Sequence, residues 1–162
     1  MIKLSKRTHQ SSEEKKIIKL MKANLKKDPI AKKFFKKYKL PISIINKAKV
    51  YFDDIDVSAK TVNKIIILNR KLLNTDIKTI ESYLIHEMVH LNQQITGKTK
   101  GHNSAKDYLD KPTEIEAFKA QIQFKEKEDG PKEAEKYVND LLDYHGLEGD
   151  KKKDKKEELM PN

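Results

Sequence analysis

Apolar residues are unevenly spread along the 162-residue chain and concentrate between about Ile42 and Phe124. This concentration predicts one hydrophobic core there, and the chain length fits one domain. The last fifteen or so positions are nearly all Lys, Asp and Glu, a composition that cannot bury enough surface to offset the entropy of ordering. We therefore predict a flexible N-terminus at residues 1–10, one domain at residues 11–147 and a disordered charged tail at residues 148–162.

The N-terminal third has the pattern of two helices. Ser11 and Glu14 have the spacing of a capping box, which predicts the start of a Lys-rich amphipathic helix. Pro29 should interrupt this helix, because a proline restricts the residue before it. A second short helix is predicted at residues 31–38, ended by Pro41, with its aromatic side chains facing the core: Phe34, Phe35 and Tyr38.

Two segments have strand character. Residues 48–52 alternate between polar and apolar positions, and residues 64–69 contain a β-branched run that is typical of a buried strand. The two could pair as antiparallel neighbours, and residues 42–45 could supply a third strand. The fold class predicted is α+β, mostly helical, with a small antiparallel sheet of two or three strands.

The strongest helical periodicity covers residues 77–94, with apolar residues at helical spacing. Thr75 is the predicted N-cap of this helix and Gly97 its end. A polar loop should follow at residues 97–110. Pro112 is then expected as the first residue of a helix running to about Glu128, before a last helix at residues 132–144.

The formal net charge of +10 suggests affinity for anionic partners such as nucleic acid. Lys and Glu are interspersed, however, and there is no basic-helix or aromatic-platform motif, so solvated helix faces are the favoured interpretation. The chain has no cysteine, which excludes disulfides and thiolate metal sites. The N-terminus lacks the apolar run of a secretory signal, and no segment approaches the roughly 20 apolar residues of a membrane span. We therefore expect a cytoplasmic protein without a membrane partner.

The predicted helix at residues 77–94 carries His86-Glu87-Met88-Val89-His90, an H-E-x-x-H motif. Residues four apart lie on one face of a helix, about 6 Å apart along its axis, so both imidazoles can reach one ion. Neutral imidazole nitrogen suits zinc well. Glu87 lies one step round the helix, where its carboxylate can take a proton from water at the metal. The motif predicts a Zn²⁺ site with Glu87 as catalytic base.

A catalytic zinc site needs a third protein ligand and an open position. A metzincin-like site would have Gly and His where this chain has Gln93 and Thr96, so that pattern is excluded. A structural site would instead be closed by a fourth protein ligand, for which His102 is the candidate. The candidates for the third ligand are His102, Asp107, Asp110, Glu114 and Glu116.

The segment from Pro112 to Phe118 resembles the E-x-x-A segment of gluzincins, especially short minigluzincin-like ones. It is similar to the pattern in CaaX-type proteases, in ImmA-like peptidases encoded near phage repressors, and in phage metallopeptidases with Pro-x-Glu-Ile-x-Ala. The resemblance covers about residues 65–123. It implies a zincin-like fold, zinc-dependent metalloendopeptidase activity on a protein or peptide substrate, Glu114 as third ligand, and Ala117 as the small residue that allows close helix packing.

Helix phase also favours Glu114, which lies near one edge of the predicted buried stripe, while Glu116 falls on the outer side. The chain departs from CaaX-type proteases at Phe118, where they carry Asp, so the residue that orients the ligating imidazoles is unassigned. Glu81 and Asp107 are its candidates. Tyr108 and His102 are the candidates for stabilising the transition state.

By the same resemblance, a strand beside the motif helix should hold the substrate by edge pairing, either residues 64–69 or residues 48–52. The abundance of Lys, Ile and Asn, together with the resemblance, indicates a phage or bacterial origin, and hence a host-cytoplasmic or virion-associated location. The alternative functions are a catalytically inactive protein of the same fold and a basic nucleic-acid-binding or virion-associated protein.

Overall fold

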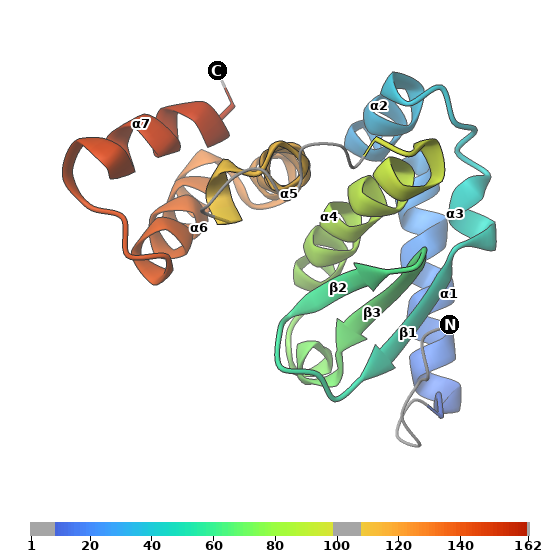
Figure 1. Ribbon diagram of the computed structural model, residues 1–162. Helices are drawn as coiled ribbons and strands as arrows, with labels where there is room; N and C mark the ends of the chain where they lie inside the picture. Colours follow the sequence, from blue (N-terminus) through green and yellow to red (C-terminus); the bar gives the residue numbers. More distant parts are fainter. Residues whose placement is uncertain (1–8, 99–107, 162) are drawn as a thin grey trace.

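The computed structural model describes residues 9–98 and 108–161. It is a mostly helical α+β fold with one small sheet, which confirms the predicted class (Figure 1). None of the described helices is both long and apolar enough to cross a membrane. In chain order, the elements are α1 Ser12–Lys27, α2 Pro29–Lys37, α3 Ile44–Lys47, β1 Lys49–Asp53, β2 Ala59–Val62, β3 Ile65–Asn69, the 3₁₀ helix η2 Arg70–Asn74, α4 Ile77–Thr96, the 3₁₀ helix η3 Tyr108–Asp110, α5 Pro112–Asp129, α6 Pro131–Tyr144 and α7 Gly149–Leu159.

The N-terminal helices form as their cap residues predict. Ser11 and Glu14 make both hydrogen bonds of the capping box, and Asp28 accepts from the first backbone amides of α2. The aromatic residues of this region, Phe34, Phe35 and Tyr38, are buried, as predicted. Gln10 lies in the N-terminus that we expected to be flexible, yet its side-chain amide pairs with both backbone groups of Phe52 at 2.8 Å, which ties it to β1.

The sheet differs from the prediction in its pairing. Its strand order is β1-β3-β2, with β1 parallel and β2 antiparallel to β3. The predicted antiparallel pairing of residues 48–52 with 64–69 is therefore wrong, and so is the strand at residues 42–45, where α3 begins. The third strand is β2, which joins β3 through a two-residue turn. Asn63 and Lys64 have positive φ angles of 50° and 64° there. A type I′ hairpin turn requires positive φ at both of its central residues.

Helix α4 packs against β2, β3, α1 and α5, and its central residues are buried. Its N-cap is Asp76, which accepts from the Thr79 amide, whereas the predicted cap, Thr75, donates its hydroxyl to the Leu72 carbonyl. Gly97 ends the helix with a left-handed φ of 73°, as predicted. The sheet and the helices α1 and α4 enclose the main core.

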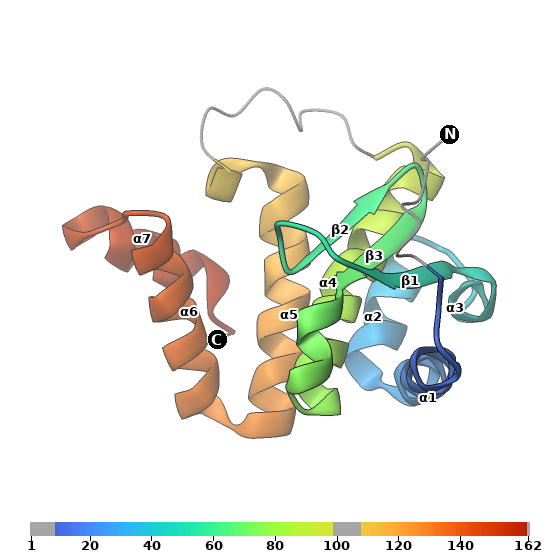
Figure 2. The same cartoon turned by 90° about the horizontal axis from the view of Figure 1, so that it is seen from below.

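Helix α5 lies between α4 and the pair formed by α6 and α7 (Figures 1 and 2). A second apolar cluster joins α5, α6, α7 and η3. The predicted disorder of residues 148–162 is wrong for the segment that forms α7. Leu159 is only 2% exposed in the second cluster, and Lys155 binds both the Leu109 carbonyl and the Asp110 carboxylate. One apolar anchor and a set of ion pairs thus order a segment whose composition suggests disorder.

Candidate metal centre

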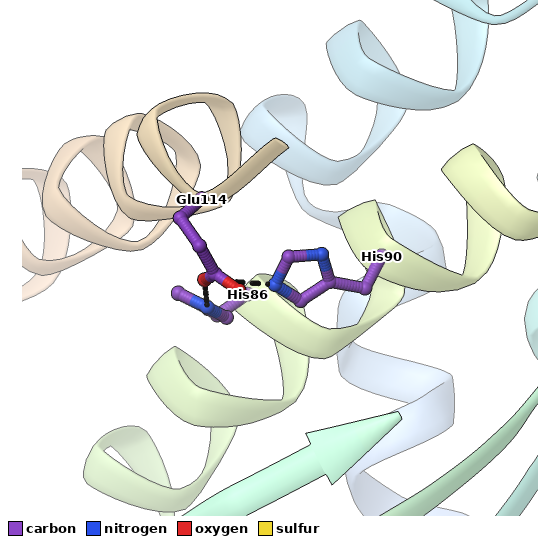
Figure 3. A group of neighbouring side chains, drawn as sticks. All are labelled: His86, His90 and Glu114. Atoms are coloured by element: carbon purple, nitrogen blue, oxygen red, sulfur yellow. Dashed lines mark hydrogen bonds and ion pairs between the residues drawn. The ribbon is translucent and has the colours of Figure 1, made fainter. Parts of the chain in front are cut away.

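Three potential metal ligands converge where α4 and α5 pack together (Figure 3). Glu114 Oε1 lies 3.2 Å from His86 Nε2 and 3.0 Å from His90 Nε2. The three ligand atoms all lie within 4.8 Å of one another. Ala117, one turn along α5 from Glu114, is fully buried and packs in a small cluster with Val89 of α4. A small side chain at this position lets the two helices approach closely enough for Glu114 to reach the imidazoles.

The spacing of these atoms fits a divalent ion. Zinc binds imidazole nitrogen and carboxylate oxygen at about 2.0–2.1 Å, which in a tetrahedron separates two ligand atoms by about 3.3 Å. The distances from Glu114 Oε1 to the two nitrogens are shorter than this by only about 0.1–0.3 Å, a gap that small side-chain rotations close. Within residues 9–98 and 108–161, the group has three members and no fourth. The donor set could therefore hold a metal ion.

Gln93 orients His90. Its Oε1 accepts from His90 Nδ1 at 2.8 Å, while its Nε2 donates to the Thr113 carbonyl and to Glu116 Oε1 at 3.0 and 3.1 Å. Because the amide nitrogen faces two acceptors, the amide oxygen must face the ring, so His90 Nδ1 carries a proton. His90 Nε2 is thereby the nitrogen aimed at a metal.

Gln121 of α5 has the same role for His86. Its Oε1 lies 2.9 Å from His86 Nδ1, and its side chain is buried. Neither glutamine was predicted for this role from the sequence, although Gln93 follows His90 by three residues and hence shares its helix face. The assignment of Glu81 to this role is wrong, because Glu81 accepts from Asn24 of α1. The other candidate, Asp107, lies outside the described residues.

The charges of the group are strongly coupled. Burial alone would raise the pKa of Glu114, but hydrogen bonds and charge from His86 and His90 outweigh it and hold that pKa well below its usual range. Burial would likewise lower the pKa of His90, yet the Glu114 carboxylate raises it to about 9. Without a metal, a proton on His90 Nε2 thus takes the place that a cation would fill.

Glu87 lies beside the group and is buried. Its Oε1 accepts a hydrogen bond of 2.9 Å from the Thr61 hydroxyl of β2, and its Oε2 lies 3.9 Å from His86 Nε2. One carboxylate oxygen is therefore fixed to the sheet while the other faces the imidazoles. Thr61 could not be found from the sequence, because the polar segment that forms β2 was not predicted as a strand.

Tyr108 of η3 lies near Glu114. Its ring lies 6.0 Å from that of Phe118 and stacks on His145 at 5.5 Å between centroids. Burial, the charge of Glu114 and a hydrogen bond with that carboxylate raise the pKa of Tyr108 above its usual range. The raised pKa keeps the phenol protonated near neutral pH, and the residue is 41% exposed.

The remaining candidates for the third ligand are not part of the group. Glu116, which we expected on the outer side of α5, is only 18% exposed and instead contacts Lys37 of α2 and Gln93 of α4. Asp110 pairs with Lys155 at 2.7 Å. His102, like Asp107, lies outside the described residues. Of the five candidates, Glu114 is the described residue that the structure brings to the histidine pair.

Compared with models of known protein families, with curated proteins and with solved structures, the chain matches none of them. The interpretation of this centre therefore depends on its own geometry and on the chemistry of its side chains.

Proposed function

We propose that the protein is a zinc-dependent metallopeptidase with a zincin-like active site, which hydrolyses peptide bonds in protein or peptide substrates. The observation that carries this proposal is the convergence of His86, His90 and Glu114 with Glu87 beside them. Two imidazoles and one carboxylate are a ligand set of catalytic zinc sites, which leave one position open for water or substrate. Neutral nitrogen and carboxylate donors also favour zinc over calcium or magnesium, which prefer oxygen ligands alone.

Each side chain has a distinct task in this proposal. Bound zinc supplies Lewis acidity, which lowers the pKa of water and polarises a carbonyl group. The free oxygen of Glu87, Oε2, accepts the proton of the attacking water and then delivers it to the leaving amine. The other oxygen keeps its hydrogen bond to Thr61, so the carboxylate does not rotate away as its charge changes. The Tyr108 phenol donates a hydrogen bond to the oxygen on which negative charge develops.

The substrate is proposed to lie along β2. Because β3 pairs with a strand on each side, the predicted edge pairing on residues 64–69 is wrong. The edges of the sheet are β1 and β2, and β2 is the one whose Thr61 contacts Glu87. An extended peptide that adds to the free edge of β2 would pass directly beside the catalytic base. This pairing recognises backbone, so it would impose little preference for side chains next to the cleaved bond.

The test is hydrolysis of an unfolded protein such as casein by purified protein. We expect activity that a chelator abolishes and added zinc restores. Glu87→Gln should lose hydrolysis by at least a hundredfold, as expected for removal of a general base, while it retains one zinc per chain. Hydrolysis that persists in Glu87→Gln, or that survives complete removal of metal, would overturn the proposal.

A further inference from the structure

A hollow of about 770 Å³ is lined by residues other than those of the metal centre. Its lining comes from α3, the starts of β1 and β3, the β2–β3 turn and the last turns of α4. Figure 1 shows these elements at the end of the sheet where β1 and β3 begin. Its floor is apolar and includes Leu91 and Ile95 of α4. Ile95 is 37% exposed, so this surface is accessible from solvent.

Three lysines surround this floor. Lys47 is the last residue of α3, Lys49 is the first residue of β1, and Lys64 belongs to the β2–β3 turn. All three are exposed, none forms an ion pair with a carboxylate in the part of the chain that the structure describes, and the lining contains no acidic residue. Lysines converging from separate elements on an apolar floor favour a ligand that carries carboxylates together with apolar groups.

The position of the hollow links it to the metal centre. Thr61, which holds Glu87, is three residues from Lys64 on the rim. β2 ends at Val62, one residue after Thr61, and Lys64 is the second residue of the turn that follows, so Lys64 lies just past the end of the strand. A peptide that continues along β2 past Glu87 would meet Lys64 first, whereas Lys49 begins β1, on the opposite side of β3 from β2.

We propose that this hollow is a remote subsite that binds an acidic peptide segment with apolar side chains, beyond the end of β2 that carries the turn. Its role in hydrolysis rests on the proposed function, whereas its binding of acidic peptide does not. Because backbone pairing on β2 recognises no particular sequence, this subsite would supply the selectivity that the strand lacks.

Binding is tested on full-length, metal-loaded Glu87→Gln protein by fluorescence anisotropy. One fluorescein-labelled decapeptide alternates Asp or Glu with Leu or Ile, and its partner has Asn and Gln in place of the acids. We expect the acidic peptide to bind at least tenfold more tightly, with affinity that falls as salt rises. Replacing the three rim lysines by Glu should reduce that affinity at least tenfold, and replacing them by Gln should reduce it less.

The matched control replaces three exposed lysines of α1 by Glu, which changes the charge equally but leaves the hollow intact: Lys15, Lys16 and Lys19. This variant should lose less than twofold. The subsite is overturned if both peptides bind equally, or if the α1 variant loses as much affinity for the acidic peptide as the variant of Lys47, Lys49 and Lys64 does. It is also overturned if a single-stranded oligonucleotide of equal charge displaces the labelled acidic peptide at a lower concentration than the unlabelled peptide does.

Hydrolysis of the same peptides by the unmodified chain separates the two proposals. Lysine-dependent binding without any hydrolysis would contradict the metallopeptidase proposal and leave the acidic-peptide site intact. Hydrolysis that requires Glu87 but does not distinguish the two peptides would contradict the subsite and leave the metallopeptidase proposal intact.

Discussion

Replacing Gln93 by Leu tests whether the metal centre depends on the residue that orients His90. Gln93 is 2% exposed and makes hydrogen bonds with three groups: His90 Nδ1, the Thr113 carbonyl and Glu116. Leu is close in volume but cannot bond to any of them. The change removes the acceptor of the part-buried imidazole N–H, which costs about 1–3 kcal/mol. We therefore expect metal-free Gln93→Leu to be less stable by about 1–3 kcal/mol.

The effect on metal binding is separable from this loss of stability. Partners that orient metal ligands usually contribute about tenfold to a hundredfold in affinity, equivalent to about 1.4–2.7 kcal/mol. Gln94 offers a matched control on the same helix, because it also bonds through both ends of its amide, to the Lys64 amide and the Thr61 carbonyl, and it does not contact either histidine. Gln94→Leu should lower stability but change zinc affinity less than twofold.

The assays are zinc competition against a chromophoric chelator and thermal unfolding of the metal-free proteins. Zinc affinity that is unchanged in Gln93→Leu would refute the orienting role. An equal loss of affinity in Gln94→Leu would show that general destabilisation, not the hydrogen bond to His90, is the cause.

Further predictions concern the catalytic base, the phenol, the histidine charge and the C-terminal helix. Thr61→Val should lower kcat about tenfold with unchanged zinc content, since a hydrogen bond to a carboxylate contributes about 1.5 kcal/mol or more. Thr61→Ser, which keeps the hydroxyl, should restore kcat. Equal rates in all three proteins would exclude a role for Thr61 in holding Glu87. Tyr108→Phe should lower kcat about a hundredfold with little effect on zinc affinity, as for loss of one donor to a developing oxyanion; wild-type kcat in this variant would exclude Tyr108 from the reaction. In metal-free protein, NMR titration should place the pKa of His90 at about 9, above its ordinary value of 6.5. Because the folded-state pKa of His90 is raised, its interaction with Glu114 stabilises the fold fully below about pH 6.5, and this stabilisation is lost as pH rises through 9. Glu114→Gln should abolish the rise in the His90 pKa. Leu159→Ala should destabilise the protein by about 2 kcal/mol or more, because it removes a buried side chain. Lys153→Ala, on the exposed side of α7, should cost less than about 0.5 kcal/mol. Equal unfolding temperatures for these two variants would contradict the docking of α7.

The features that were predictable from the sequence are those encoded locally. The spacing of His86 and His90 fixes their common face once the segment is helical, and helix phase separates Glu114 from Glu116. The convergence of Glu114 on the histidines depends on the packing of α5 on α4, which the resemblance to E-x-x-A segments anticipated and the structure confirms.

Features that depend on distant partners were not predictable. The parallel pairing of β1 with β3 follows from the insertion of β2 as a hairpin, and β2 itself has no apolar alternation. Gln121 lies 35 residues from His86, whose imidazole it orients. The ordering of α7 depends on Leu159 entering a cluster built by other helices. In each case the determining contact lies outside the window that local patterns cover.

The most direct test of the metal centre is the stoichiometry and coordination of bound zinc, measured by elemental analysis and X-ray absorption on protein purified without added metal and then reconstituted. We expect one ion per chain with two imidazole nitrogens and a carboxylate oxygen, and a loss of affinity of at least a hundredfold in both His90→Ala and Glu114→Ala. Zinc that binds as tightly in either variant, or that is absent from the wild-type chain after reconstitution, would contradict the assignment of this centre.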